Sequence, residues 1–479
     1  MEELRFYNTF TRRKEPFKPI IADEVRMYTC GPTVHDFAHL GNYRAYIFED
    51  ILRRTLKFFG YSVIQVMNLT DVDDKTIRKS RERGVTLQEY TREYTESFFE
   101  DLDALRIERA EFYPEATKHI PEMVELIEKL IANGHTYETD GSIYFRISSF
   151  PAYGRLANVK LDDLRSGVRV DSDEYEKEDV RDFALWKSWT PDDGDVFWDT
   201  SIGKGRPGWH IECSAMSTKY LGEHFDIHSG GVDNIFPHHE NEIAQSLCGY
   251  GGDFVNVWMH NAHLMVNSEK MSKSLNNFFK LKEVTSTGIS PRAVRYFLLS
   301  AHYRQPLNLV YDPDNNITDS FDAASGALDR IDEFRTKLAE LQKQGEDSGE
   351  AGDDILDIID KARSSFKGAL GNDLDISGAL GALFGMIKDV NRLLDEAQVT
   401  AVDAVALDDL LMDWDRVLGV IRPEERGEID VERIEALIEE RKQARQAKDF
   451  ARSDEIRDLL ASEGIIIQDT PGGVRWRKK

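Results

Sequence analysis

The chain has 479 residues, of which 41% are hydrophobic, so it is long enough for several domains with buried cores. Its 61 basic and 87 acidic residues give a formal net charge of −26. This charge by itself argues against a nucleic-acid partner, although it leaves room for a local basic face. No apolar run is long enough to cross a bilayer, and the first residues lack the pattern of a signal peptide. We therefore expect a cytoplasmic protein without a membrane partner.

The acidic residues are spread along the whole chain, which suits solubility in concentrated salt, and we hypothesise a halophilic source. The three cysteines, Cys30, Cys213 and Cys248, are far apart and odd in number. Reduced thiols, some of them metal ligands, are therefore expected in place of a disulfide framework. Cys248 has no partner pattern, and we expect it to be a small buried residue.

The first part of the chain predicts a strand–helix–strand unit. Residues 24–30 have the pattern of a buried strand, residues 41–59 that of an amphipathic helix, and residues 62–68 that of a second strand. Gly60 is placed to end the helix. Such a unit is typical of a parallel sheet covered by helices.

A similar alternation of predicted helices and strands follows residue 200. A helix is expected over 208–222, a strand and loop over 225–231, a helix over 237–249 with Pro237 in its first turn, and a strand over 254–260. The fold class predicted is α/β, with two halves of one doubly wound, Rossmann-like parallel sheet separated by an insertion.

The insertion and the C-terminal part carry their own signals. The insertion has a helical pattern over 121–134, a strand pattern over 142–148 and a charged stretch over 171–182. From about residue 291 the pattern is helical, interrupted by the polar, acidic stretch 342–354, which is typical of a solvated loop.

The last part, 434–464, predicts two short helices followed by a basic tail. The predicted domains are the two halves of the sheet domain at 1–115 and 201–260, an insertion at 116–200, a connecting region at 261–316, a helical bundle at 317–406 and a C-terminal domain at 407–479.

The segment FPHHENEI, residues 236–243, raises the question of a metal site. His238 and Glu242 are four residues apart and face the same side of a helix, whereas His239 points elsewhere. Zinc prefers four ligands from Cys, His and carboxylate, and Cys30 and Cys213 are natural completions in a reduced protein. The alternative is a polar helix start whose acidic residues favour the helix dipole.

Two further motifs suit a polyphosphate. HLGN, residues 39–42, stands where the first helix starts, and a helix N-terminus with a glycine favours a phosphate. EKMSKSLNN, residues 269–277, places two lysines in a small polar loop. Alone, each is more often an ordinary turn or a solvated loop, but their joint occurrence beside one predicted sheet favours function.

These two motifs resemble the HIGH and KMSKS signatures of class I aminoacyl-tRNA synthetases. The surrounding sequence resembles the cysteinyl-tRNA synthetase family, nearly from end to end. The segments that carry the resemblance are TCGPTVHDFAHLGN, NLTDVDDK, DFALWK, GRPGWHIECSAMS, FDIHSGGVDNIFPHHENEIAQS and EKMSKSLNNFF. It implies ATP-dependent ligation of L-cysteine to tRNA(Cys) through a cysteinyl-adenylate, by a protein expected to be a monomer.

The resemblance also implies roles for single residues. One zinc ion per chain would be held by Cys30, Cys213, His238 and Glu242, and Mg²⁺ would accompany ATP. The residues implied in ATP binding are His39, Gly41, Asn42, Lys270, Ser272 and Lys273, with His39, Lys270 and Lys273 as the catalytic group. Gly31, Thr70, Trp209 and Asp233 are implied in binding cysteine. On physical grounds alone, Asp233 could equally cap the helix expected at Pro237.

Two positions depart from the family signatures. Asn42 stands where HIGH has its last histidine, and we expect its amide to keep the role with altered strength. Asn276 stands where LGN is common, and its effect on the loop stays open. The resemblance further implies that residues 317–406 bind tRNA and residues 407–479 recognise the anticodon.

Zinc would have a clear purpose, because a cavity selecting by shape alone separates cysteine poorly from serine, whereas a soft metal distinguishes a thiol from a hydroxyl. Two rival functions fit parts of the sequence. Related ligases join activated cysteine to an amino sugar but lack the C-terminal unit, so residues 407–479 favour tRNA. A non-catalytic binding module would not need His39, Lys270 and Lys273.

Overall fold

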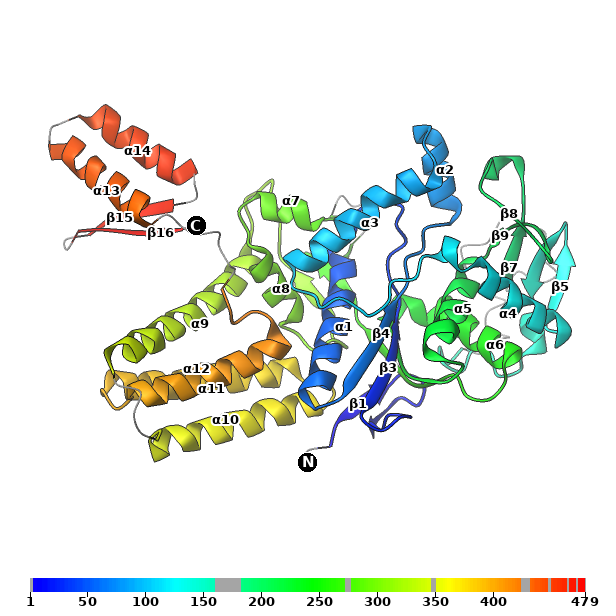
Figure 1. The fold of residues 1–479 in the computed structure, drawn as a ribbon, viewed down its shortest axis with the longest axis horizontal. Helices are drawn as coiled ribbons and strands as arrows, with labels where there is room; N and C mark the ends of the chain where they lie inside the picture. Colours follow the sequence, from blue (N-terminus) through cyan, green and yellow to red (C-terminus); the bar gives the residue numbers. More distant parts are fainter. Residues whose placement is uncertain are drawn as a thin grey trace. The chain divides into compact units, whose positions relative to one another are not determined.

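The computed structural model describes residues 3–159, 182–271, 277–345, 350–423, 431–446, 449–462, 465–470 and 473–478. The described residues fall into two compact units, Met1–Arg422 and Pro423–Lys479 (Figure 1). Within this part of the chain, every helix is too short or too polar to span a membrane. Cys30, Cys213 and Cys248 are free thiols.

The helices are α1 (Leu40–Phe58), α2 (Asp74–Arg83), α3 (Leu87–Ala104), α4 (Ile120–Ala132), α5 (Trp209–Leu221), α6 (Glu240–Gly249), α7 (Leu281–Ser286), α8 (Pro291–Leu299), α9 (Asp319–Gln344), α10 (Asp353–Gly371), α11 (Ile376–Asp395), α12 (Ala401–Leu418), α13 (Val431–Gln446) and α14 (Phe450–Ser462).

The strands are β1 (Arg5–Asn8), β2 (Arg13–Pro16), β3 (Glu24–Thr29), β4 (Ser62–Met67), β5 (Thr136–Thr139), β6 (Ser142–Phe145), β7 (Phe183–Ser188), β8 (Trp198–Thr200), β9 (Gly203–Pro207), β10 (Phe225–Gly231), β11 (Val255–Asn261), β12 (Leu264–Val266), β13 (Glu269–Lys270), β14 (Leu307–Leu309), β15 (Ile465–Thr470) and β16 (Gly473–Lys478).

The central sheet joins the two predicted halves. In the described residues its strand order is β11-β10-β3-β4, and each neighbouring pair is parallel. β3 and β10 lie side by side although almost two hundred residues separate them. Ligands of such sheets bind beyond the carboxyl ends of the strands where the order reverses, which here is the junction of β3 and β10. The predicted α/β fold class is confirmed.

Helices cover both faces of this sheet (Figure 1). Val25 and Met27 of β3 pack with Phe48 and Leu52 of α1 in one hydrophobic cluster. Tyr28, which alternation turns to the opposite face, packs in the cluster that contains α5. The sheet is thus buried on both sides, as its continuous apolar strands require.

Helix α1 starts beside the carboxyl edge of the sheet. His39 is its N-cap in an extended conformation, and the His39 backbone N–H donates to Asn42 Oδ1 at 3.1 Å. The helix ends at Phe58, and Gly60, with a φ of 98°, reverses the chain into β4. The predicted helix over 41–59 is therefore confirmed within a residue at each end.

The insertion forms a mixed unit with a sheet of its own. Its strand order in the described residues is β5-β6-β7-β9-β8, and its neighbouring strands are antiparallel. Helix α4 shares a hydrophobic cluster with α5 and α6. Apart from Asp182, the charged stretch 171–182 lies outside the described residues.

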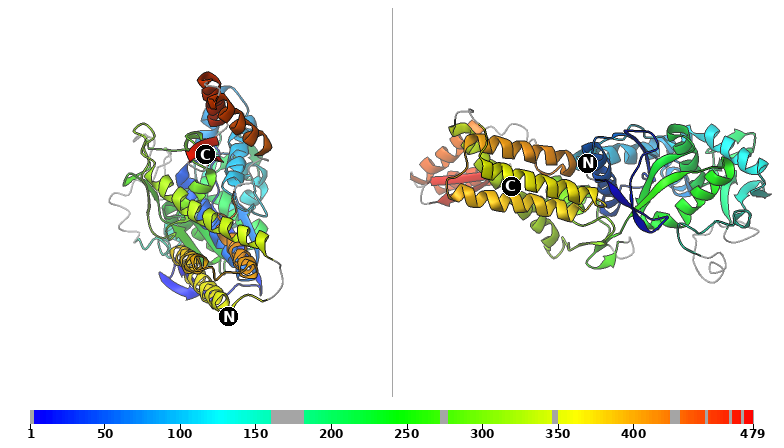
Figure 2. Two further views of the ribbon diagram at one scale, coloured as in Figure 1. Left: turned by 90° about the vertical axis from the view of Figure 1, so that its left-hand side faces the viewer. Right: turned by 90° about the horizontal axis from the view of Figure 1, so that it is seen from below.

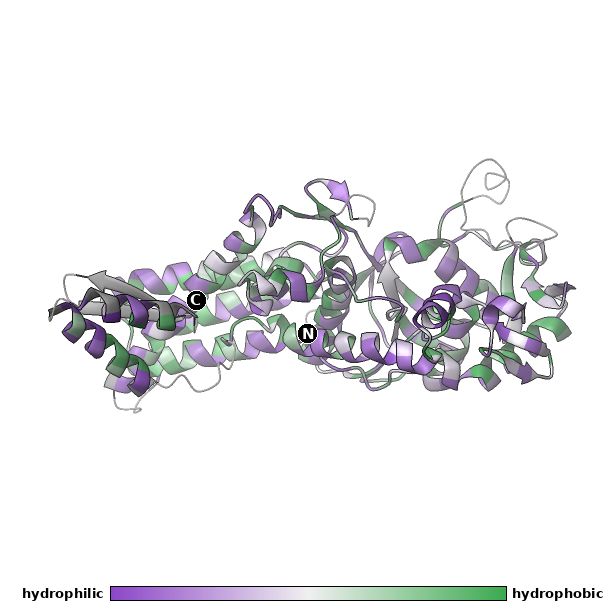
Figure 3. Cartoon of the chain, turned by 90° about the horizontal axis from the view of Figure 1, so that it is seen from above, coloured by the Kyte–Doolittle hydropathy of each residue, from purple (hydrophilic) through white to green (hydrophobic). Residues whose placement is uncertain are grey.

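Four long helices, α9 to α12, run side by side (Figures 1 and 2). Hydrophobic and hydrophilic residues alternate around them, as expected for amphipathic helices in a bundle (Figure 3). Their apolar sides join α1 in one core, in which Phe366 and Trp414 stack with ring centroids 4.5 Å apart. The second unit contains α13, α14 and the antiparallel pair β15–β16.

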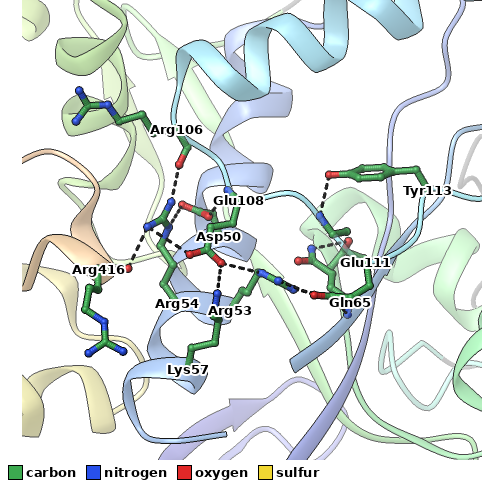
Figure 4. Close-up of polar contacts among 12 residues, drawn as sticks. Asp50, Arg53, Arg54, Lys57, Gln65, Arg106, Glu108, Glu111, Tyr113 and Arg416 are labelled. Atoms are coloured by element: carbon green, nitrogen blue, oxygen red, sulfur yellow. Dashed lines mark hydrogen bonds and ion pairs between the residues drawn. The ribbon is translucent and has the colours of Figure 1, made fainter. Parts of the chain in front are cut away.

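A buried ion cluster ties α1 to α8 and to the loop after α3. Figure 4 shows the contacts of Arg54 with Asp50, Arg106 and Arg416. Asp50 accepts from Arg295 Nη2 at 2.6 Å and from Arg54 Nε at 2.8 Å. Arg54 and Arg295 also donate to carbonyls at the end of α12, those of Arg416 and Leu418. These bonds satisfy carbonyls that have no partner inside the helix.

Helix α6 begins after a kink in the chain. Phe236 is extended (φ −139°, ψ 130°) and separates Ile235 from Pro237, and the regular α-helix begins at Glu240. The predicted helix start at Pro237 coincides with this kink, although the regular α-helix begins three residues later than predicted. Two predicted domain boundaries, 200 and 407, fall at the end of β8 and inside α12.

Candidate active site and metal centre

A cleft of about 460 Å³ lies at the carboxyl edge of the sheet, where β3 and β10 end. The loop after β3, the start of α1 and the loop after β10 form most of it. The predicted site residues among its lining are Cys30, Gly31, His39, Gly41, Asn42, Trp209, Asp233 and Lys270. Motifs from the two halves of the sequence thus meet in one cavity.

The four predicted metal ligands come together at this cleft. One donor atom each from Cys30, Cys213, His238 and Glu242 lies within 4.8 Å of the others. His238 Nε2 is 3.5 Å from Cys213 Sγ and 3.1 Å from Glu242 Oε1. Cys30 follows β3, Cys213 lies in α5, and the other two flank the start of α6, so the packing of three elements sets the arrangement.

Neighbouring side chains orient these donors. His228 Nε2 is 2.9 Å from Glu242 Oε2, and His210 Nδ1 is 2.8 Å from His238 Nδ1. Each contact occupies the atom that faces away from the other ligands. Such outer partners fix the orientation of metal-binding side chains. Sequence reasoning missed both histidines.

A second set of four donors overlaps the first. It consists of Cys30, His228, His239 and Glu242, and one donor atom of each residue again lies within 4.8 Å of the others. His239 Nε2 is 3.2 Å from Cys30 Sγ, and its Nδ1 is 2.8 Å from His260 Nε2. His239, which the sequence placed outside the metal site, is therefore within reach of it.

The donor set fits zinc by two observations. First, Glu242 Oε1 is buried and makes no hydrogen bond with the described residues, so an acceptor oxygen is left facing the thiols. Second, two thiols, an imidazole and a carboxylate are ligand types that zinc accepts. A cation at this point would satisfy the oxygen and the sulfur atoms together.

Burial favours the neutral forms of the imidazole and the two thiols at this site. Burial, together with neighbouring histidines, lowers the pKa of His238 to about 3, against the opposing effect of Glu242. Hydrogen bonding with Cys213 and burial raise the pKa of the Cys30 thiol. For Cys213 the hydrogen bond with Cys30 lowers the pKa, but burial and Glu242 outweigh it and the pKa is raised. Metal binding must therefore displace thiol protons.

Trp209 covers the metal centre on the cleft side. Its indole stacks on the His238 imidazole with ring centroids 4.6 Å apart and planes 29° apart. Because Trp209 is 48% exposed, one face of the ring is available to a ligand in the cleft. Asp233 also lines the cleft, and its carboxylate makes no hydrogen bond or ion pair within the described part of the chain. The helix-capping role considered for Asp233 is not observed: Asn234, and not Asp233, accepts the Gly231 backbone N–H at 3.0 Å, and Ile235–His239 has no side-chain cap.

Residues of the HLGN motif line the same cleft as Cys30 and Trp209. His39 and Asn42 line it at the start of α1, and the His39 ring lies 4.2 Å from the ring of Phe278. A Cβ on Gly41 would come within 2.8 Å of the His39 ring, so this glycine allows the turn to close. Lys270 ends β13 at the rim. Ser272, Lys273 and Asn276 lie outside the described residues.

Among the four predicted cysteine-binding residues, Gly31, Trp209 and Asp233 line the cleft and Thr70 does not. Its side chain is buried (1% exposed), and its hydroxyl donates to Glu212 Oε2 at 2.8 Å. Burial raises the pKa of the Glu212 carboxyl.

Glu240, two residues from Glu242, accepts from the backbone N–H groups of Gly154 and Ala157. These two hydrogen bonds join the insertion to α6.

The sequence comparisons decide the family. The family model described as tRNA synthetases class I (C) catalytic domain matches residues 16–318, the DALR domain matches 365–422, and the cysteinyl-tRNA ligase anticodon binding domain matches 431–477. A cysteine--tRNA ligase of Brachyspira hyodysenteriae is 49% identical over all of both chains. The chain belongs to the cysteine--tRNA ligase family. It is therefore an enzyme, a ligase with a class I aminoacyl-tRNA synthetase catalytic domain.

Other similarities agree with this family. The Protochlamydia amoebophila cysteine--tRNA ligase is 46% identical over 99% of this chain and 98% of that protein. Among solved structures, Mycobacterium tuberculosis methionyl-tRNA synthetase in complex with methionyl-adenylate has a TM-score of 0.57 at 15% identity, covering 83% of this chain and 88% of that chain. A putative arginyl-tRNA synthetase from Campylobacter jejuni has a TM-score of 0.55 at 12% identity, covering 85% and 94%. These structures establish similarity of fold alone.

In this member of the cysteine--tRNA ligase family, His228 could not be assigned to the site from the sequence because its contacts depend on long-range strand pairing. His228 lies in the middle of β10, and its neighbours follow from parallel pairing with β3 and β11, in which His228 stands opposite Tyr28 and Trp258. Pairing between strands so distant in sequence leaves no local pattern. A histidine in the middle of a predicted strand was the available signal.

Proposed function

We propose that the protein ligates L-cysteine to tRNA(Cys) at the expense of ATP, through a cysteinyl-adenylate, with one zinc ion selecting the thiol. The observation that carries the proposal is the meeting of a Cys₂–His–Glu donor set and a phosphate-binding helix start in one cleft. The family's name supports the amino acid and the acceptor.

In the first step, a carboxylate oxygen of cysteine forms a bond to the α-phosphorus of ATP while the bond from that phosphorus to the bridging oxygen breaks. Pyrophosphate leaves, and Mg²⁺ bound with ATP would supply positive charge for it. His39, Gly41 and Asn42 are placed to bind the nucleotide at the start of α1, where the helix dipole favours phosphate. Lys270, with Ser272 and Lys273 as predicted, would balance the charge that develops.

The cysteine side chain would lie on the opposite side of the cleft. Zinc, when bound, supplies a soft acid that prefers sulfur to a hydroxyl oxygen. We favour Cys30, Cys213, His238 and Glu242 as its ligands over the overlapping set, because His228 occupies the second oxygen of Glu242 and so directs Oε1 to the thiols. Trp209 would pack over the substrate, and the Asp233 carboxylate would accept from its ammonium group, beside Gly31.

In the second step, a hydroxyl of the terminal ribose of tRNA attacks the cysteinyl carbonyl, and AMP leaves. The bundle 317–406 is proposed to bind tRNA and the domain 407–479 to recognise the anticodon. An amino-sugar acceptor is disfavoured, because residues 431–477 match an anticodon binding domain and such a domain would have no role with an amino sugar. We further propose that the protein acts in the cytoplasm as a monomer.

Aminoacylation of an unfractionated tRNA mixture tests this function. With ATP and Mg²⁺, we expect charging with cysteine and at least a hundredfold less with serine, and loss of cysteine charging after zinc chelation. Charging of both amino acids alike, or cysteine charging that survives full removal of zinc, would contradict the proposal.

The acidic composition leads to a separate proposal of a halophilic source. The same assay at low and high KCl tests it. Activity and solubility are expected to be retained at molar salt and to fall at low salt, where repulsion within a chain of net charge −26 is least screened. The reverse salt profile would contradict a halophilic origin.

A further inference from the structure

The hydroxyl of Thr70 stands between the two segments that carry the candidate thiol ligands. It donates to Glu212 Oε2 at 2.8 Å and accepts from Asn68 Nδ2 at 3.2 Å. Glu212 is the neighbour of Cys213 in α5. Asn68, Thr70 and Glu212 are each at most 3% exposed, so water does not compete for these bonds.

Asn68, which donates to the Thr70 hydroxyl, also binds the loop that begins with Cys30. The Gly31 backbone N–H donates to Asn68 Oδ1 at 2.9 Å. Gly31 approaches this segment so closely that a Cβ would come within 1.8 Å of the Asn68 carbonyl oxygen. Backbone bonds continue the attachment, from Thr70 N–H to the Pro32 carbonyl at 3.1 Å and from Val34 N–H to the Thr70 carbonyl at 3.0 Å.

We propose that Asn68 and Thr70 are positioning residues that hold the Cys30 loop and the Cys213 helix at the separation a shared metal ion requires. The inference rests on the proposed zinc centre and assigns Thr70 a role different from direct contact with cysteine. A continuous path of hydrogen bonds leads from Gly31, the residue after Cys30, to Glu212, the residue before Cys213. It passes through the side chains of Asn68 and Thr70.

The loss of the Thr70 hydroxyl has consequences on both sides of this path. Valine has the shape of threonine but neither donates nor accepts, so Asn68 Nδ2 and Glu212 Oε2 would each lose a partner in a buried site. Buried polar groups left unpaired are costly, and the two segments can regain partners only by shifting. A shift of a few tenths of an ångström between two thiols is enough to weaken a tetrahedral site.

Binding of Co²⁺ to the metal-depleted full-length chain tests the proposal, because its sulfur-to-cobalt absorption reports on both thiols. We expect Thr70→Val to bind Co²⁺ at least tenfold more weakly, with reduced absorption. In cysteine-dependent ATP–pyrophosphate exchange, its KM for cysteine should rise at least tenfold while its KM for ATP changes less than twofold. Thr70→Ser, which keeps the hydroxyl, should restore both properties.

Thr55→Val is the matched control. Thr55 is fully buried in α1, and its hydroxyl makes no hydrogen bond with the described residues. It should bind Co²⁺ as the wild type does. Asn68→Ala removes the side chain that binds the Gly31 N–H and the Thr70 hydroxyl. It should also weaken Co²⁺ binding at least tenfold, and it tests the path even if Thr70→Val does not fold.

Three outcomes would overturn the inference. These are wild-type Co²⁺ affinity in both Thr70→Val and Asn68→Ala, an equal loss in Thr55→Val, or failure of Thr70→Ser to restore binding. A wild-type chain that binds neither Zn²⁺ nor Co²⁺ would overturn the proposed zinc centre as well, whereas a metal-binding wild type with unaffected variants overturns the positioning role alone.

Discussion

The indole of Trp209 lies over the imidazole of His238, with ring centroids 4.6 Å apart, at the point where the cleft meets the candidate metal centre. One ring face packs against this candidate metal ligand, and Trp209 also lines the cleft. Trp209 begins α5, the same helix that carries Cys213, so a single element supplies both the cover of the site and one of its thiols.

Trp209→Ala should raise the KM for cysteine in ATP–pyrophosphate exchange about tenfold, since the loss of an aromatic contact is worth roughly 0.5–1.5 kcal/mol beyond area burial. The KM for ATP should stay within twofold, because the nucleotide is proposed to bind at α1. Trp209→Phe should be intermediate. Equal rises in both KM values would instead indicate a general distortion of the cleft.

Gly31→Ala should remove zinc and reduce exchange at least tenfold, because the new Cβ would overlap the Asn68 carbonyl oxygen. Metal content by atomic absorption and exchange activity measure the effect. Gly326→Ala is the control: its Cβ meets no heavy atom within 4 Å in α9, and it should stabilise the fold by about 0.5–1 kcal/mol. A Gly31→Ala protein with full zinc would show that the loop can move without loss of the site.

Asn42→Ala should destabilise the protein by about 1 kcal/mol, because the His39 N–H would lose its acceptor at the start of α1. It should also raise the KM for ATP several-fold. Thr400→Ala removes a comparable cap, the acceptor of the Asp403 N–H in α12, and should lower stability without changing the KM for ATP. If Asn42→Ala behaves like Thr400→Ala in both measurements, Asn42 is a helix cap and no more.

Asp50→Asn should destabilise the fold by about 3–5 kcal/mol at pH 7, because it leaves Arg295 buried without its partner. Burial raises the pKa of Asp50, but Arg54 and Arg295 outweigh burial and hold the pKa below its usual value. A carboxyl with a lowered pKa stabilises the fold above its unfolded pKa of about 3.9 and loses this effect as the pH falls through the folded value.

The cost of Asp50→Asn should therefore shrink between pH 5 and pH 3, as measured by urea unfolding. Asp360→Asn, which breaks an exposed ion pair with Arg363, should cost less than about 1 kcal/mol at each pH. A pH-independent cost for Asp50→Asn would mean that shape or packing, and not charge, is what the protein loses.

The sequence predicted much of this site because its signals are local. The four-residue spacing of His238 and Glu242 holds although a π-helical turn precedes α6, and Cys30 stands directly after a strand that alternation and β-branched residues identify. Parallel strands place their carboxyl ends at one edge, so the meeting of both halves of the chain followed from the fold class.

Other features depend on long-range packing and could not be predicted. The contacts of His228 and His210 arise from strand register and from the approach of α5 to α6. Thr70 was expected to face cysteine, but its hydroxyl bonds to Glu212, which is 142 residues away in sequence. The break at Phe236, in contrast, had a local signal, because a proline disfavours the helical conformation in the residue before it.

Cys213→Ser tests the central claim, that a metal held partly by this thiol selects cysteine. The variant should lose zinc and reduce cysteine-dependent ATP–pyrophosphate exchange at least a hundredfold. The overlapping donor set lacks Cys213, so retained zinc would instead favour Cys30, His228, His239 and Glu242. Zinc content and exchange measured on the same preparation decide the question: loss of both is the predicted result, and unchanged exchange would contradict the account.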